Sequence, residues 1–110
     1  MKIKDQVKLM KNVLRGAKYL DKNEPNWYNS VDLDCFDMGN SSTCVAGWVF
    51  KDKIVDEYGS ERGYEYAVNE MSLDTDRLGF EYDWSVEISM SEQYGFLGDI
   101  WLRAQTPGAA

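Results

Sequence analysis

Residues 2–20 carry a helical hydrophobic repeat, which constrains the fold more than any other feature of the chain. Apolar side chains recur at intervals of four, three, four and three residues, at Ile3, Val7, Met10, Leu14 and Ala17. This spacing is typical of one face of an amphipathic α-helix. Leu9, Val13 and Leu20 widen the apolar face to about 160°. We therefore expect a helix over residues 1–22 whose apolar face packs on its own domain.

Basic residues line one flank of this expected helix: Lys4, Lys8, Lys11, Arg15, Lys18 and Lys22. Residues 1–22 have a net charge of +5 and residues 23–110 a net charge of −12. A basic amphipathic helix can lie on an anionic membrane or in a partner's groove. Because no Trp or Phe marks a lipid-facing side, we expect no membrane contact. Because the rest of the chain repels phosphates, we expect no direct binding of nucleic acid.

Residues 80–90 alternate strictly between apolar and polar side chains. A period of two with aromatic and β-branched residues predicts a β-strand. Residues 30–36 show a shorter alternation and are the candidate partner strand. The polar side of the two predicted strands carries five carboxylates, those of Glu81, Asp83, Glu87, Asp32 and Asp34.

Three further helices are expected. The first covers residues 44–58, begins after a cap at Ser42 or Thr43, and ends at Gly59. The second follows Ser60, and the third follows a capping box at Ser89. Residues 105–110 are expected to form a flexible tail. The predicted fold is one α+β domain over residues 1–110, with about four helices and a small two-stranded antiparallel sheet. An all-α fold with residues 80–90 as a connector is the alternative.

Cys44 is the candidate nucleophile, because the first turn of a helix favours a thiolate. The chain has no histidine, the base that such a thiol normally needs. The competing interpretation is a small buried apolar residue. Cys35 and Cys44 supply only two of the four ligands of a structural zinc site, and Asp74 and Asp76 match only part of a calcium loop. We expect no catalytic residue, no metal and no cofactor.

The segment Thr43-Cys44-Val45-Ala46-Gly47-Trp48 resembles the T-x-C-x-A-G-W element of small bacteriophage-encoded proteins of unknown function. Those proteins tend to carry an upstream Trp, as Trp27 is here, and a Leu-Gly-apolar step, as in residues 78–80. Their second cysteine corresponds to Gly39, so a paired-cysteine role is not carried over. The resemblance implies a phage accessory protein and brings no activity. From the residues themselves, we expect Gly47 to permit close helix contact and Trp48 to anchor the core.

The function predicted from these observations is that of a small acidic accessory protein that binds, and inhibits, a basic or DNA-binding host protein. Glu81, Asp83 and Glu87 would lie on one exposed strand face, whose successive positions are about 6.8 Å apart. Such a face steers cationic partners. Two alternatives remain open: a cysteine-dependent enzyme or redox protein that uses Cys44, and a structural component that self-associates. No apolar leader follows the basic N-terminus, so the expected compartment is the cytoplasm, that of the host if the protein is phage-encoded.

Overall fold

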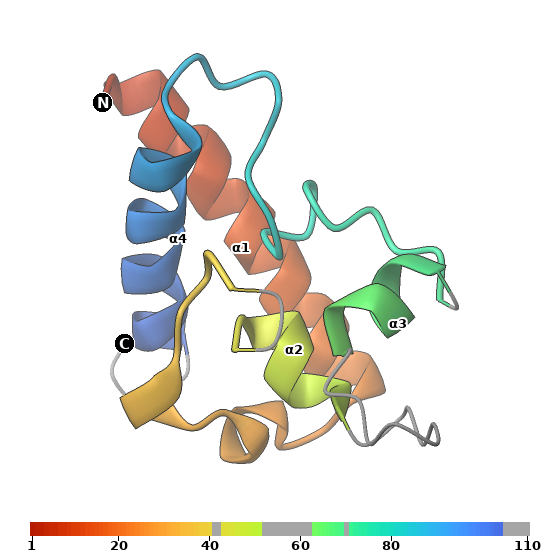
Figure 1. Cartoon of the computed structure of the whole chain (residues 1–110). Helices are drawn as coiled ribbons and strands as arrows, with labels where there is room; N and C mark the ends of the chain where they lie inside the picture. The colour runs from red at the N-terminus through yellow and green to blue at the C-terminus, as the bar shows by residue number, and fades with distance from the viewer. Residues whose placement is uncertain (41–42, 52–62, 70, 105–110) are drawn as a thin grey trace.

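Helices, turns and irregular connections make up the part of the chain that the computed structural model describes, residues 1–40, 43–51, 63–69 and 71–104. The elements are α1 (Ile3–Asn23), η1 (Trp27–Ser30), η2 (Leu33–Cys35), α2 (Val45–Val49), α3 (Gly63–Asn69) and α4 (Met90–Ala104), where η1 and η2 are short 3₁₀ helices. In Figure 1, α1 packs beside α4, and α2 packs beside α3. These residues contain no strand, so the predicted two-stranded sheet is wrong and the all-α alternative fits.

Residues 71–89 form an irregular connection before α4, which we call the loop, and residues 80–89 of this loop replace the predicted strand. Phe80 and Val86 are buried, but Trp84 and Met90 of the same predicted face are exposed. The backbone of this loop bonds to the side chain of Gln93 on α4, which accepts from the Asp83 N–H at 2.8 Å and donates to the carbonyls of Asp83 and Val86, both at 3.1 Å. A side chain therefore takes the place of the neighbouring strand.

The predicted partner strand is also absent, because residues 33–35 form η2. The Asp32 carboxylate accepts a hydrogen bond from the backbone N–H of Asp34 at 3.0 Å. Such a local bond turns the backbone and competes with an extended ladder. The alternation in residues 30–36 thus reflects a turn.

The N-terminal helix is present as α1, but only part of its predicted apolar face is buried. Leu9, Val13 and Leu20 are fully buried, whereas the 3-7-10-14 repeat faces solvent. Gly16 lies on the buried face, and a Cβ there would come within 1.9 Å of the Leu78 carbonyl oxygen. The missing side chain lets the loop before α4 approach this side of α1, and this approach selects which face is covered.

The other predicted helices are present in part. α4 begins as expected, because the Ser89 hydroxyl accepts from the backbone N–H of Glu92 at 3.2 Å. α2 is shorter than predicted within the described residues, and α3 lies inside the helix predicted after Ser60. The predicted caps at Ser42 and Ser60, the end at Gly59 and the tail 105–110 lie outside the described residues. The alternative cap at Thr43 is wrong, because Cys44 is the N-cap of α2.

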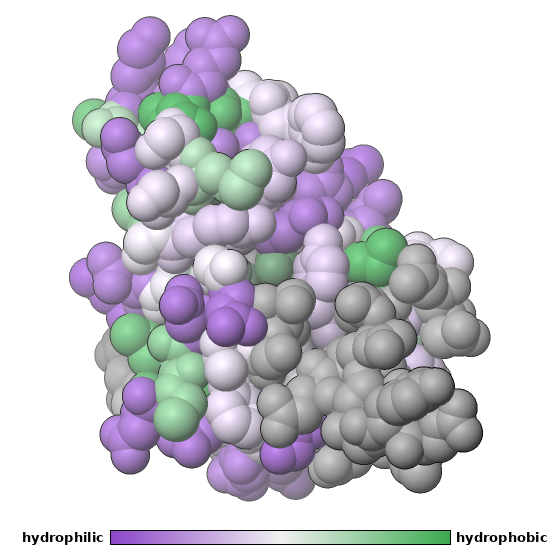
Figure 2. All heavy atoms as spheres, viewed as in Figure 1, coloured by the Kyte–Doolittle hydropathy of each residue, from purple (hydrophilic) through white to green (hydrophobic). Residues whose placement is uncertain are grey.

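The core centres on Trp101 of α4. Its ring stacks on Phe80 with centroids 5.8 Å apart and meets the edge of Trp27 at 5.6 Å. Its indole N–H donates to the Gly79 carbonyl at 2.7 Å. Gly79 has a φ of 72°, a left-handed conformation that favours glycine, and it packs on Val13 of α1. Trp101 therefore joins α4, the loop and α1. On the face seen in Figure 2, apolar residues form only small separate groups.

Candidate functional site

Asp83 lies inside the molecule, not on an exposed acidic face. Its side chain is 7% exposed. One carboxylate oxygen accepts from the Asn12 amide at 2.8 Å, and the other accepts from the Ser85 backbone N–H at 2.8 Å. Burial alone would raise the pKa of this carboxyl, but the hydrogen bonds from Ser85 and Asn12, with the charge of Lys8, hold it below its usual value. Asp83 therefore joins α1 to the loop.

Glu81 lies in the same loop and is half-buried. It accepts a hydrogen bond from the Tyr64 hydroxyl at 2.8 Å and another from the Thr75 hydroxyl. Burial raises the pKa of Tyr64, and the bond to the Glu81 carboxylate raises it further. Glu81 and Asp83 thus do not share a solvent-facing side, because the period-2 geometry that would align them is absent.

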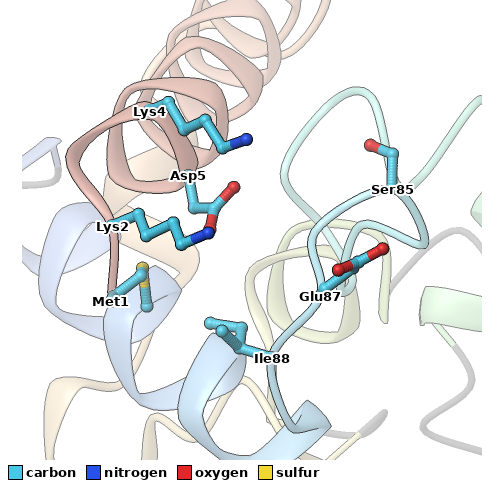
Figure 3. A pocket seen from close by; sticks show the side chains of 7 residues that line it. All are labelled: Met1, Lys2, Lys4, Asp5, Ser85, Glu87 and Ile88. Carbon is cyan, nitrogen blue, oxygen red and sulfur yellow. The ribbon is translucent and has the colours of Figure 1, made fainter.

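Glu87 is exposed, but lysines face it. It lies at a hollow of about 340 Å³ between the N-terminal end of α1 and the loop. Figure 3 shows Glu87 on the loop side and Lys2 and Lys4 on the α1 side. Asp32 and Asp34 are exposed at η2. The structure therefore does not gather the five predicted carboxylates on one face. Binding of a basic partner stays a prediction for Glu87, Asp32 and Asp34, the three that are exposed.

The thiol of Cys44 lies at the N-cap of α2 and is buried. Its sulfur accepts from the Gly47 N–H at 3.3 Å. Burial raises the pKa of this thiol to about 11, more than the backbone hydrogen bonds lower it. At neutral pH the group is a protonated thiol, which is a poor nucleophile. The geometry therefore supports the interpretation of Cys44 as a small buried apolar residue.

The rest of the predicted motif has structural contacts. The Thr43 hydroxyl donates to the Asp37 carbonyl at 3.4 Å. The close approach of α2 and α3 is made at Gly63, where a Cβ would come within 2.5 Å of the Gly47 carbonyl oxygen. Trp48 is half-buried, with the Lys51 ammonium 5.0 Å from its ring centroid. The core anchor is Trp101, not Trp48.

The exposed repeat of α1 is the strongest candidate site. Its four members, Ile3, Val7, Met10 and Leu14, are between 42% and 77% exposed. We call these four residues the α1 stripe. Scattered exposed apolar side chains are ordinary, but a continuous line of them on one helix marks an interaction surface. The sequence placed these four residues on the same broad apolar face as Leu9, Val13 and Leu20, and it did not show which part of that face is covered.

Basic side chains flank the α1 stripe, and two of them also bind the loop. The Arg15 guanidinium donates to the Arg77 carbonyl at 3.0 Å and to the Asn12 side chain, and the Lys8 ammonium donates to the Ser85 hydroxyl. Lys4, Lys11 and Lys18 are exposed and lie nearer the stripe on the helical wheel. These three lysines form the charged edge of the candidate surface.

Comparison of the chain with protein-family models, with curated proteins and with solved structures found no significant match. The phage resemblance therefore stays a prediction; in this chain Thr43 directly precedes Cys44, one residue closer than in that element. Among the described residues, no helix is long and apolar enough to cross a membrane, and no group of three or more potential ligand side chains could hold a metal ion.

Proposed function

We propose that the protein is a non-catalytic binding protein that docks an acidic amphipathic helix of a partner protein on the α1 stripe. The observation that carries this proposal is the exposure of Ile3, Val7, Met10 and Leu14 along one side of α1, while its opposite side is buried. Covering such a line removes apolar area from water, which stabilises a complex by roughly 25 cal/mol per Å².

The spacing of the stripe supports a helical partner. Its members follow one another at intervals of four, three and four residues, the repeat of a coiled-coil seam. In heptad positions, Val7 and Leu14 are a, and Ile3 and Met10 are d. A seam this narrow fits the side chains of one facing helix better than the broad apolar face that a lipid surface requires.

Charge selects the chemistry of the partner helix. Lys4, Lys11 and Lys18 occupy successive e positions beside the seam. Residues at e and g form the interhelical ion pairs that decide which partner binds. A partner with Glu or Asp beside its own apolar seam therefore complements α1.

A second copy of the chain complements α1 less well. In an antiparallel pair, the lysine edge of one stripe lies beside the lysine edge of the other, and such like-charge contact is costly. In a parallel pair, the lysines of one copy meet the g flank of the other copy. There Val13 and Leu20 are buried in their own domain and offer the lysines no charged partner.

The test uses a synthetic helical peptide of about four heptads with Leu at a and d and Glu at e and g. A second peptide carries Lys in place of every Glu. We expect the Glu peptide to bind, measured by fluorescence anisotropy, with an affinity that falls as salt rises. We expect no binding of the Lys peptide.

Two matched variants locate the binding surface. Leu14 is 58% exposed on the stripe, and Leu33 is 57% exposed on η2. Leu14→Asp should weaken the Glu peptide at least about tenfold, since covering a Leu stabilises by about 1.5–3 kcal/mol. Leu33→Asp should leave the affinity unchanged. Equal affinities in the two variants, or binding of anionic vesicles in preference to the peptide, would overturn the proposal.

A further inference from the structure

A hollow of about 230 Å³ lies where α2, α3, α4 and the loop before α4 meet, and it is independent of the α1 stripe. Aromatic rings of Tyr64, Phe80 and Tyr94 line it, together with the sulfur-bearing residues Met38 and Cys44. The Glu81 carboxylate is the single charged side chain among the described lining residues. A ring-lined hollow with one carboxylate is a specific chemical environment.

The carboxylate of Glu81 is held in place but not neutralised by its described partners. The Tyr64 hydroxyl donates to one oxygen at 2.8 Å, and the Thr75 hydroxyl donates to the other. Both donors are neutral groups, so the negative charge remains. Each carboxylate oxygen can accept more than one hydrogen bond, so each still has acceptor capacity for a ligand.

Neighbouring groups respond to this negative charge. Burial is the main cause of the raised pKa values of Tyr64, Tyr94 and Cys44, and the charge of Glu81 raises each of them further. The two phenols and the thiol therefore stay neutral at physiological pH. The hollow presents the half-buried side chains of Tyr64 and Tyr94 and the carboxylate of Glu81, which together favour a cation and disfavour phosphates and carboxylates.

We propose that this hollow binds a small organic cation of the alkylammonium class. An aromatic ring attracts such a cation through its π system, and Tyr64 and Tyr94 are the partly exposed rings of the hollow. The carboxylate attracts it through charge, and more strongly than in water because the surroundings are partly buried. A metal ion is a poorer candidate, because the described residues offer no group of three ligand side chains.

The first experiment compares two probes of the same shape. tert-Butylammonium and tert-butanol differ mainly in charge, and the ammonium form is the one present at pH 7. Binding is followed by the NMR signals of the tyrosine and phenylalanine rings and of the probe methyl groups, which ring currents shift upfield. We expect saturable binding of tert-butylammonium and at least tenfold weaker binding of tert-butanol. Equal binding of both probes would overturn the proposal.

Charge variants assign the site. Glu81→Gln should weaken tert-butylammonium binding on the order of tenfold or more, because the charge is removed. Glu92→Gln is the matched control, because Glu92 is exposed and lies on the opposite side of α4 from Tyr94. It should bind as the unchanged chain does. Equal weakening in the two variants, or none in Glu81→Gln, would contradict a carboxylate-based site.

A third variant fills the hollow and keeps the carboxylate. A Cβ at Gly39 would lie 3.8 Å from the Tyr94 ring, so Gly39→Leu should extend into the hollow. It should abolish binding of tert-butylammonium while the circular dichroism spectrum stays unchanged. This variant decides the question if Glu81→Gln does not fold, and retained binding in Gly39→Leu would overturn the proposal.

Discussion

The two cysteines have very different environments although they lie nine residues apart. Cys35 is exposed at η2, and Cys44 is buried at the N-cap of α2. A helix start lowers the pKa of a thiol, and burial raises it. At Cys44 burial is the larger effect, and it raises the pKa to about 11. The position of a thiol in a helix therefore does not decide its reactivity by itself.

We expect iodoacetamide to modify Cys44 much more slowly in the native protein than in the urea-unfolded chain at neutral pH. Cys35 is the internal control, because its exposed thiol should react at similar rates in both states. Mass spectrometry of the two cysteine peptides measures both rates. A native Cys44 that reacts as fast as Cys35 would restore the cysteine-dependent enzyme as a hypothesis.

The same shift in pKa has a consequence for stability. The thiol of the unfolded chain ionises near pH 9.0, and the native thiol ionises near pH 11. Between these values the unfolded state releases its proton first, so the free energy of unfolding falls as pH rises. Cys44→Ala should show a shallower fall than the unchanged chain.

Among the elements, α1 and α4 use glycine in opposite ways. Gly16 of α1 lies against the loop, where a Cβ would come within 1.9 Å of the Leu78 carbonyl oxygen and 3.1 Å of the Trp101 ring. Gly95 of α4 faces open space, with no atom within 4 Å of a Cβ. Gly16 is a contact residue, and Gly95 is only a weak point in a helix.

We expect Gly16→Ala to lower the free energy of unfolding by about 2 kcal/mol or more, because backbone atoms must move apart. Gly95→Ala should raise it by about 0.5–1 kcal/mol, since alanine is the better helix former. Urea denaturation of the two variants measures both changes. Similar effects of the two substitutions would show that α1 and the loop are not in such close contact.

Across the whole molecule, a polar network joins helices that are far apart in sequence. Asn12 of α1 donates to the Asp83 side chain, and Gln93 of α4 bonds to the Asp83 backbone. All three residues are buried. Buried polar groups that have partners stabilise one arrangement, and the loss of one partner leaves the others unsatisfied. The network therefore holds the loop between α1 and α4.

We expect Asp83→Asn to lower the free energy of unfolding at pH 7 by about 1–3 kcal/mol, because an amide cannot accept from all of the present donors. The pKa of Asp83 is lowered from 3.8, so its charge stabilises the fold above that pH and this stabilisation is lost as the pH falls below it. The variant should therefore lose less stability on acidification. Thermal denaturation at pH 7 and pH 3 measures both effects.

Asp99→Asn is the matched control for this prediction, because Asp99 is an exposed carboxylate of α4. It should change stability by less than about 0.5 kcal/mol at pH 7. If Asp83→Asn behaves like Asp99→Asn, the network does not hold the loop.

The two candidate sites differ in how much of each can be predicted from the sequence. The α1 stripe and its lysine edge are visible as a 4-3-4 repeat and a run of basic residues. Their exposure is not visible in the sequence, because Leu9, Val13 and Leu20 belong to the same broad apolar face and only packing decides which part of it is covered. The sequence does not predict the hollow at Glu81, because Tyr64 and Tyr94 come from separate helices. No short-range spacing relates them to Glu81.

The sequence by itself determined the presence of α1 and the start of α4, because helical hydrogen bonds and the Ser89 cap join residues within a few positions of one another. Only the tertiary structure decided which face of α1 is covered, since burial depends on what packs there and Gly16 admits the loop. It also decided against a strand at residues 80–90. A strand is stable only with a partner, and in this chain the Gln93 side chain instead bonds to the Asp83 N–H and to the carbonyls of Asp83 and Val86.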